Sequence, residues 1–447
     1  MQEDRYEAEP LDDPDADIGK RDPEAVVSRA GGRTPGHANK DAKIDDLQQN
    51  LTDLEMKMKE DTKIVVTGRD TKFYGGVVNP PVYHASTVLF DSMEELENRQ
   101  QRTGLKMSYG LRGTPTTFCL EQAIAELEGG YRTVLCSSGL AAICMALMAF
   151  VKCGDNILIV DSVYGPTRKF CDTWLPRYGV STTYYEPMIG ADIADLIRPE
   201  TSVVFVESPG SITFEVQDVP AIAAAGRAKG AKVLMDNTWA SPLYFKPFTK
   251  GVDVSIQAAT KFIVGHSDVL LGSVTTNKES WKAVKSCFSE YGQQGAPDDV
   301  YFAQRGLRTL SIRLKRSQET GLKLARWLGD RPEVEQVLHP ALPGCPGHEF
   351  WKRDFLGASG LFAVVLKPYT RTALASMLDH MQLFGMGFSW GGYESLIVPY
   401  DLSGVRTVTH YEWSGGYRVL RIYAGLEDPE DLISDLEAGF ERLNAAC

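Results

Sequence analysis

Four stretches of the sequence decide the fold: SVVFVE (residues 202–207), PAIAAAGRAK (220–229), KVLMD (232–236) and VDVSI (252–256). The first, third and fourth are short apolar runs typical of buried strands, and the second has the composition of a helix. A strand followed by a helix and another strand predicts a right-handed crossover between parallel strands. The sequence therefore predicts a mostly parallel sheet covered by helices on both faces.

The same alternation is found upstream. Residues 133–136 and 156–161 are also strand-like, and SSG (137–139) opens a helical stretch. In sheets of this kind ligands bind beyond the carboxyl ends of the strands. The residues that closely follow strand-like runs are Ser138, Tyr164, Glu207, Asp236 and Lys261. We therefore expect these side chains to converge on one site.

The second half of the chain predicts a smaller domain. A helix over about 300–328 leads out of the parallel sheet, and strands at 361–366 and 417–423 precede a closing helix at 429–443. This order is typical of a small α+β domain. The predicted parts are an acidic extension without stable structure (1–60), an arm (61–120), a large domain (121–315) and a small domain (316–447).

The composition limits the classes of partner. Across 447 residues the formal net charge is -12, which disfavours nucleic acid or an anionic membrane. No apolar stretch approaches the ~18 residues of a membrane-spanning helix, and the start of the chain (MQEDRYEAEPLDD) lacks a signal-peptide pattern. The eight cysteines form no CxxC pair and the seven histidines no HExxH motif, so we expect reduced thiols, no metal site and a cytoplasmic location.

The stretch SIQAATKFIVGHSD (255–268) carries the strongest chemical signal. Lys261 directly follows a strand of small and apolar residues, so burial is expected to lower its pKa and make its amine a nucleophile. Thr260 adds a neighbouring hydroxyl. Taken alone, a lysine at a strand end is more commonly a surface side chain whose ammonium reaches water.

Asp236 offers the lysine a partner of matching chemistry. It ends the run KVLMD, one strand before Lys261, so the two residues are expected at the ends of adjacent strands. A carboxylate there could keep the pyridine nitrogen of pyridoxal 5′-phosphate (PLP) protonated, while the lysine holds the cofactor as a Schiff base. An aspartate at a strand end is also a common N-cap of the next helix.

Two further features fit the same cofactor. The segment SSGLA (137–141) would start a helix whose N–H groups could hold a phosphate, and Gly139 would allow close approach of the backbone. Tyr164 could stack its ring on the pyridine ring. Each feature is weak alone, because helix starts and half-buried tyrosines are common.

Four segments together resemble the Cys/Met-metabolism family of fold-type-I PLP enzymes. They are SIQAATKFIVGHSD (255–268), ESPGS (207–211), DNTW (236–239) and SWGGYESL (389–396), and the resemblance runs from about residue 61 to the C-terminus. It implies an α/β fold of the fold-type-I PLP-transferase class, with a mostly parallel seven-stranded sheet flanked by helices and a smaller C-terminal α+β domain. It also implies PLP as the cofactor.

The resemblance assigns roles to residues around the cofactor. Lys261 matches the Schiff-base lysine, Asp236 the partner of the pyridine nitrogen, and Tyr164 the ring-stacking tyrosine. The phosphate-binding residues match Ser138, Gly139, Leu140 and Thr260.

The resemblance also implies a substrate site. The substrate carboxylate is expected to bind Arg421, with Ser389 and Trp390 beside it. An arginine suits this role because its guanidinium can hold a carboxylate through two parallel hydrogen bonds.

The phosphate clamp departs from the family pattern. The family reads Tyr-x-Arg in a segment supplied by a neighbouring subunit, whereas this chain has Tyr109, Leu111 and then Arg112 one position late. In an extended segment Arg112 would point to the other side, so either it turns back or another donor replaces it. The resemblance still implies that the arm (61–120) serves the partner's site in a homodimer, or in a homotetramer built as a dimer of dimers.

The implied activity is cleavage of the β-carbon–sulfur bond of an amino-acid thioether. For L-cystathionine the products are L-homocysteine, pyruvate and ammonia, a step of methionine biosynthesis. Lys261 would abstract the Cα proton, and Lys261 or Tyr109 would protonate the leaving sulfur.

Two alternatives stay open. The nearest keeps the fold and cofactor but acts at the γ-carbon, as in cystathionine γ-synthase, cystathionine γ-lyase or methionine γ-lyase. Trp390 and Trp239 favour the β-lyase, because γ-acting relatives usually have leucine and phenylalanine at the matching positions. The second is a regulator with the PLP fold but no turnover, whose acidic extension binds a partner.

Overall fold

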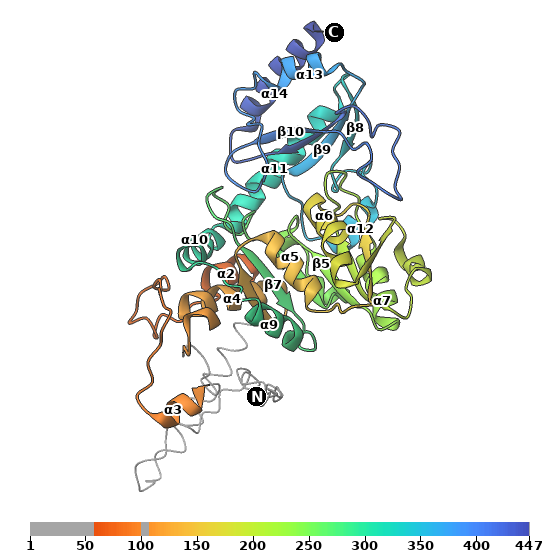
Figure 1. Ribbon diagram of the computed structural model, residues 1–447. Helices are drawn as coiled ribbons and strands as arrows, with labels where there is room; N and C mark the ends of the chain where they lie inside the picture. Colours follow the sequence, from red (N-terminus) through yellow and green to blue (C-terminus); the bar gives the residue numbers. More distant parts are fainter. Residues whose placement is uncertain (1–57, 100–106, 447) are drawn as a thin grey trace.

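The computed structural model describes residues 58–99 and 107–446. They form a large domain on a seven-stranded sheet and a small domain on a four-stranded sheet (Figure 1). The predicted unstructured extension (1–60) lies almost wholly outside the described residues.

The large sheet confirms the predicted α/β architecture. Its strands lie in the order β1-β7-β6-β5-β4-β2-β3, and the neighbouring pairs are parallel except those that β7 forms. The strands β4 and β5 contain two of the three apolar runs that predict the fold, and β6 begins within the third, at Val254. The bounds are β1 (Arg132–Cys136), β2 (Asn156–Val160), β3 (Ser181–Tyr185), β4 (Thr201–Glu207), β5 (Lys232–Asp236), β6 (Val254–Gln257) and β7 (Gly272–Thr276).

Local sequence determines where the flanking helices begin. The Ser138 hydroxyl accepts a hydrogen bond from the backbone N–H of Ala141 at 3.1 Å and caps one helix, and Asp218 caps another in the same way. The helices of this domain include α4 (Pro115–Glu128), α5 (Gly139–Met148), α6 (Gly165–Thr173), α7 (Val219–Ala228) and α9 (Trp281–Glu290).

The long helix predicted over 300–328 is two helices. These are α10 (Pro297–Leu307) and α11 (Leu310–Gly329), and Thr309 between them has non-helical backbone angles. The break is stabilised by Arg308, whose Nη1 donates to the carbonyls of Ile64 and Thr67 at 2.7 and 2.8 Å. A contact with a distant segment therefore ends a helix that local periodicity predicts to continue.

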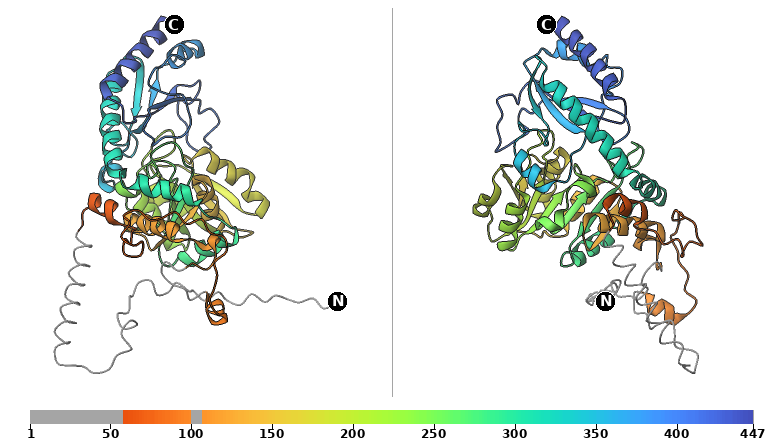
Figure 2. Two further views of the ribbon diagram at one scale, coloured as in Figure 1. Left: turned by 90° about the vertical axis from the view of Figure 1, so that its left-hand side faces the viewer. Right: turned by 180° about the vertical axis from the view of Figure 1, so that it is seen from behind.

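The small domain confirms the predicted α+β pattern. Its sheet is antiparallel in the order β10-β11-β9-β8. Figures 1 and 2 show α11 running from the large domain into the small one, so the predicted boundary after residue 315 falls inside this helix. The elements are β8 (Val334–Leu338), α12 (His348–Asp354), β9 (Leu361–Leu366), α13 (Arg371–Leu378), β10 (Leu396–Tyr400), β11 (Val419–Tyr423) and α14 (Pro429–Ala445).

The arm carries α2 (Glu60–Val66), α3 (Met93–Glu97) and a short 3-10 helix η3 (Gly110–Arg112). In Figures 1 and 2 the segment around α3 stands away from both domains. Large apolar side chains of this segment are exposed, with Leu89 at 84% and Met93 at 68%. Because a single chain leaves such side chains in water, the arm has the character of a contact surface.

The described residues show neither a membrane-spanning helix nor a metal-binding cluster. No helix among them is long and apolar enough to cross a membrane. Within the same ranges, no group of three or more His, Cys, Asp or Glu side chains could hold a metal ion. The seven cysteines in the described part of the chain are free thiols.

Candidate active site

Lys261 lies in a turn shortly after β6, with its amine directed at a loop of the small domain. Its Nζ donates a hydrogen bond to Oγ of Ser389 at 2.7 Å. Burial lowers the pKa of Lys261 to about 8; the positive charge of Arg421 acts in the same direction, and Asp236 opposes the change. Such an amine is partly uncharged near neutral pH and can act as a nucleophile or a base.

Asp236 ends β5, on the strand next to the one that leads to Lys261. Its Oδ1 accepts hydrogen bonds from the N–H and Oγ1 of Thr238 at 3.0 and 2.5 Å. The Thr238 hydroxyl oxygen in turn accepts from the N–H of Ala258 at 2.9 Å, which ties the aspartate to the turn of Lys261. Burial raises the pKa of Asp236, while Thr238 and Lys261 oppose this, so local contacts favour its charged form.

Glu207 is a site residue whose contact the sequence does not reveal. It lies opposite Asp236 in the register of β4 and β5, and its Oε2 accepts a hydrogen bond from the backbone N–H of Tyr164 at 2.7 Å. Burial raises the pKa of Glu207 well above its usual value, and the neighbouring Asp236 adds to the rise. Glu207 thus fixes the backbone of Tyr164, whose side chain is 43% exposed.

The N-terminus of α5 starts close to the turn that carries Lys261. A Cβ at Gly139 would lie 2.5 Å from Cβ of Ala258, so only glycine lets this helix start so close to the turn of Lys261. PLP requires helix N–H groups for its phosphate, an amine for its aldehyde and a carboxylate that accepts from its pyridine nitrogen, and the residues present therefore fit this cofactor. The hydroxyl of Thr260 donates to the carbonyl of Leu271 and accepts from its N–H, while Leu140 is 40% exposed at the helix start.

Arg421 lies on β11 with its guanidinium near the loop that carries Ser389. Its Nη2 donates to the carbonyl of Ser389 at 3.2 Å, and the residue is only 9% exposed. Among the described residues no carboxylate lies within ion-pair distance of Arg421. A buried guanidinium with donors to spare is suited to an incoming carboxylate.

The turn from Ser389 to Gly391 packs closely against the backbone of Lys261. Ser389 has a φ of 82°, which is uncommon for a residue with a side chain, and a Cβ at Gly391 would lie 2.9 Å from the Lys261 carbonyl carbon. The Trp390 ring centroid lies 5.3 Å from Nζ of Lys261 and 5.4 Å from the ring of Phe262. The structure thus brings Ser389, Trp390, Arg421 and Lys261 together.

The clamp residues are the exception. Tyr109 is 47% exposed and Arg112 lies in η3, and no hydrogen bond or ion pair of the described residues joins either one to Lys261, Asp236 or Arg421. The segment is not extended at Arg112, because η3 turns the backbone there. Within the described part of a single chain, neither predicted clamp residue is hydrogen-bonded to these three site residues.

A buried carboxylate links the two domains beside the site. Asp161, 1% exposed, accepts hydrogen bonds from the backbone N–H groups of Thr407, Val408 and Thr409 at 2.8 to 3.2 Å. It also accepts from Arg168, and these donors hold the pKa of Asp161 well below its usual value. We call residues 401–417 the strap, because this segment of the small domain is bound across the large domain.

The strap has a second anchor. Its Tyr411 hydroxyl donates to Oε1 of Glu215, and its Arg406 donates to the hydroxyl of Thr213. Glu215 is 1% exposed, so the strap supplies donors to a buried carboxylate at this point as well. Sequence patterns do not indicate either anchor.

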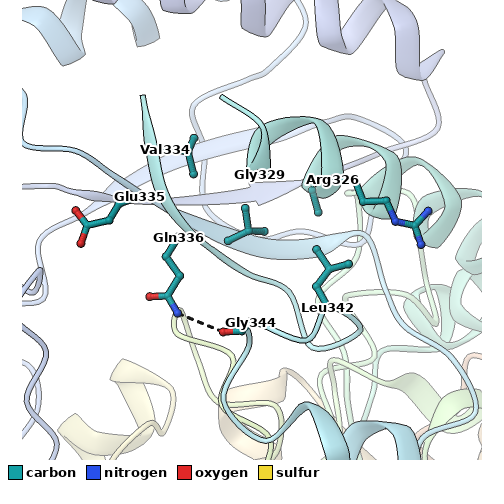
Figure 3. Close-up of a pocket in the computed structure, with 9 residues that line it drawn as sticks. Arg326, Gly329, Val334, Glu335, Gln336, Leu342 and Gly344 are labelled. Atoms are coloured by element: carbon teal, nitrogen blue, oxygen red, sulfur yellow. Dashed lines mark hydrogen bonds between the residues drawn. The ribbon is translucent and has the colours of Figure 1, made fainter. Parts of the chain in front are cut away.

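One cavity lies elsewhere, in the small domain. It has a volume of about 240 Å³ between the end of α11 and β8, and Figure 3 shows Gln336 bonded across it to the carbonyl of Gly344. It shares no residue with the site around Lys261, so that site does not depend on it.

Comparison with known proteins gives a consistent result. Residues 61–441 match the family described as "Cys/Met metabolism PLP-dependent enzyme". A cystathionine β-lyase of Escherichia coli is 46% identical over 392 residues, which cover 86% of this chain and 99% of that protein. An L-alanine/L-glutamate racemase of a Wolbachia strain is 41% identical over 398 residues, covering 86% of this chain and 98% of the relative.

A solved structure agrees with the fold. The crystal structure of a cystathionine γ-synthase of Xanthomonas oryzae pv. oryzae, in complex with aminoacrylate and cysteine, has a TM-score of 0.80 and 29% identity, covering 87% of this chain and all of that one. The family match covers most of the chain, and the site contains the groups that the cofactor needs. This chain belongs to the Cys/Met-metabolism family of PLP-dependent enzymes.

Proposed function

We propose that this chain is a PLP-dependent carbon–sulfur lyase that converts L-cystathionine and water to L-homocysteine, pyruvate and ammonia. The observation that carries the proposal is the meeting of three groups: the Lys261 amine, the Asp236 carboxylate and the Arg421 guanidinium. Lys261 and Arg421 both bond to Ser389, and Asp236 and Arg421 both influence the pKa of Lys261.

Each group has a distinct part in the reaction. When bound, PLP supplies an electron sink for the electron pair left on Cα. Asp236 keeps a proton on the pyridine nitrogen, and Arg421 holds the substrate carboxylate. Lys261 Nζ takes the Cα proton.

The balance of the reaction follows from these roles. As the Cβ–S bond breaks, the sulfur leaves with a proton from Lys261 or from Tyr109 of the partner subunit. Water then hydrolyses the released aminoacrylate to pyruvate and ammonia. The chain's own groups thus bind and orient the substrate and move protons. Which bond breaks depends on the carbon that carries the sulfur.

Trp390 supports β-cleavage over γ-cleavage. Its indole lies beside Lys261 and packs on Phe262. It therefore occupies space that cleavage at the γ-carbon, one carbon further from Cα, would require. One relative is named an L-alanine/L-glutamate racemase, a reaction that also begins with removal of a Cα proton, so racemisation is a separate outcome to measure.

Product analysis tests the proposal. Incubation of the holoenzyme with L-cystathionine should release pyruvate and homocysteine in equal amounts. Release of cysteine and 2-oxobutyrate would identify a γ-lyase. Conversion of L-alanine to D-alanine without any pyruvate from thioethers would identify a racemase, and either result would overturn the proposal.

The pKa of Lys261 should make cofactor uptake depend on pH. We expect the rate of covalent PLP binding to the apoprotein to rise through about pH 8, because only the uncharged amine attacks an aldehyde. The sign follows from the lowered pKa: the reactive form gains as pH rises through 8, whereas an exposed lysine would require pH near ~10. Stopped-flow absorbance measures the rate, and a rate that is flat across this range would contradict the expectation.

We also propose that the enzyme is a homotetramer, built as a dimer of dimers whose subunits share active sites, with the arm (61–120) serving the partner subunit. The exposed apolar side chains of the arm and the exposure of Tyr109 support this. The division into a large domain (121–315) and a small domain (316–447) belongs to the same proposal. So does a location in the cytoplasm, where the free thiols would stay reduced.

Mixing two inactive variants tests site sharing. Tyr109→Ala and Lys261→Ala should each be inactive, but unfolding and refolding them together should restore about a quarter of wild-type activity, since half of random dimers carry one intact site. The pyruvate assay measures the recovery. A mixture as inactive as its parts would show that each chain completes its own site.

A further inference from the structure

Tyr400 lies on the same face of the small sheet as Arg421. In the register of β10 and β11, Val398 is opposite Arg421 and Tyr400 is opposite Val419. Side chains two residues apart on a strand point to the same face, so Tyr400 is the diagonal neighbour of Arg421. The guanidinium carbon of Arg421 lies 5.5 Å from the centroid of the Tyr400 ring, within the reach of a cation–π contact.

The surroundings of Arg421 make this contact important. The arginine is buried, it donates a hydrogen bond to the carbonyl of Ser389, and no carboxylate among the described residues neutralises it. Burial lowers the pKa of Arg421, and the nearby Tyr400 and Tyr164 oppose that change. An aromatic ring stabilises a desolvated guanidinium without consuming its N–H donors. The donors that Ser389 does not use therefore stay available for a ligand.

The position of Tyr400 is restricted by the chain that follows it and by packing. The strap follows Tyr400 directly in the chain, and Asp161 holds its backbone at Thr407 to Thr409. Tyr400 is half-buried and packs against the main hydrophobic core, which residues of both sheets form. This packing restricts the ring, which can therefore define where the Arg421 guanidinium lies.

We propose that Tyr400 is a positioning residue for substrate binding, which holds the Arg421 guanidinium so that its free N–H groups meet the substrate α-carboxylate. This rests on the proposed function in so far as Arg421 binds that carboxylate. Tyr400 acts through Arg421 on a group that does not react. It therefore affects the binding of substrate and not the rate of the chemical step.

The test compares Tyr400→Leu, which removes the ring, with Tyr400→Phe, which keeps it. Tyr178→Leu, a 48% exposed tyrosine of the large domain, is the matched control. In the holoenzyme, Tyr400→Leu should raise KM for L-cystathionine and the dissociation constant of propionate together by about fivefold, or about 1 kcal/mol. Tyr400→Phe and the control should stay within about twofold of wild type, and kcat should change little in all three.

Propionate is the direct probe, because it carries the carboxylate but has no amine to join the cofactor. Its binding is read from the change that it causes in the absorbance of the bound cofactor, so turnover is not required. If Tyr400→Leu does not yield folded protein, Tyr400→Met removes the ring with less change in shape. A purely structural role would lower kcat and stability as well, whereas the positioning role predicts a change in KM and in propionate binding with kcat retained.

Three outcomes would overturn the inference: wild-type KM and propionate binding without the ring, equal impairment in Tyr400→Phe, or a loss confined to kcat. The proposed function fails separately. If no thioether is cleaved but propionate still binds more weakly to Tyr400→Leu, the lyase proposal falls and the role of Tyr400 stands. If cystathionine is cleaved and ring removal leaves both constants unchanged, only the role of Tyr400 falls.

Discussion

Lys261→Ala is expected to lose both the visible absorbance of the holoenzyme and its pyruvate-forming activity, the latter by about 10⁴-fold. Alanine removes the amine that holds the cofactor covalently and the group that receives the Cα proton. The two losses have one cause, since both functions belong to the same Nζ. Absorption spectra after gel filtration and the pyruvate assay measure them.

Lys278→Ala is the control for this variant, because Lys278 is exposed on the turn after β7. It should keep the spectrum and the activity of the wild type. A Lys261→Ala protein that retains covalently bound PLP would show that another lysine is the anchor. Retention of full pyruvate release would remove Lys261 from the reaction altogether.

Asp236→Asn is expected to lower kcat by about 10²- to 10³-fold while the protein stays folded. Asparagine has nearly the same shape, and its side-chain oxygen can still accept the hydrogen bonds from Thr238. What is lost is the negative charge that keeps the pyridine nitrogen protonated and the ring electron-poor. The effect should therefore fall on kcat, measured by pyruvate release at saturating substrate.

A matched control is Asp253→Asn. Asp253 is also a buried aspartate beside the large sheet, but its Oδ2 accepts from the N–H of Val233 near the start of β5, away from Lys261. Asp253→Asn should lower the melting temperature and leave kcat close to that of the wild type. If the two variants lose kcat equally, the loss in Asp236→Asn reflects general damage to the sheet and not the charge of Asp236.

The predictions for Lys261→Ala and Asp236→Asn both assume that Asp236, and not its neighbour Glu207, carries the negative charge. Two carboxylates in register on adjacent strands disfavour each other's charge, and burial raises the pKa of both. Asp236 has Thr238 and Lys261 to stabilise its charged form. Glu207 has a backbone N–H of Tyr164 and the charge of Arg406, yet burial and Asp236 still raise its pKa well above the usual value. We therefore expect the charge to reside on Asp236, and the site depends on this difference of partners.

The sequence by itself determined the large sheet and the order of its parts. Apolar runs and helical stretches obey local rules of strand and helix formation, so β4, α7, β5 and β6 follow from their own residues. The same rules put Asp236 and Lys261 at the carboxyl ends of adjacent strands, where a ligand site is expected. Their roles in catalysis stay predictions until variants are measured.

Only the tertiary structure decided which distant groups meet. The break between α10 and α11 depends on contacts of Arg308 with Ile64 and Thr67, and the strap depends on Asp161, which lies far from it in sequence. Neither contact leaves a periodic pattern, because a single polar side chain that bonds to a remote backbone has no local signature.

The features of the site also divide into those that the sequence predicts and those that only the fold produces. Lys261 could be identified from its sequence motif. Its pKa of about 8, however, results from burial and from Arg421, which the fold places near it from the other domain. The contact of Arg421 with Tyr400 arises from the register of β10 and β11. Register and burial are properties of the assembled chain, since they depend on which surfaces pack together and not on the residues of one segment.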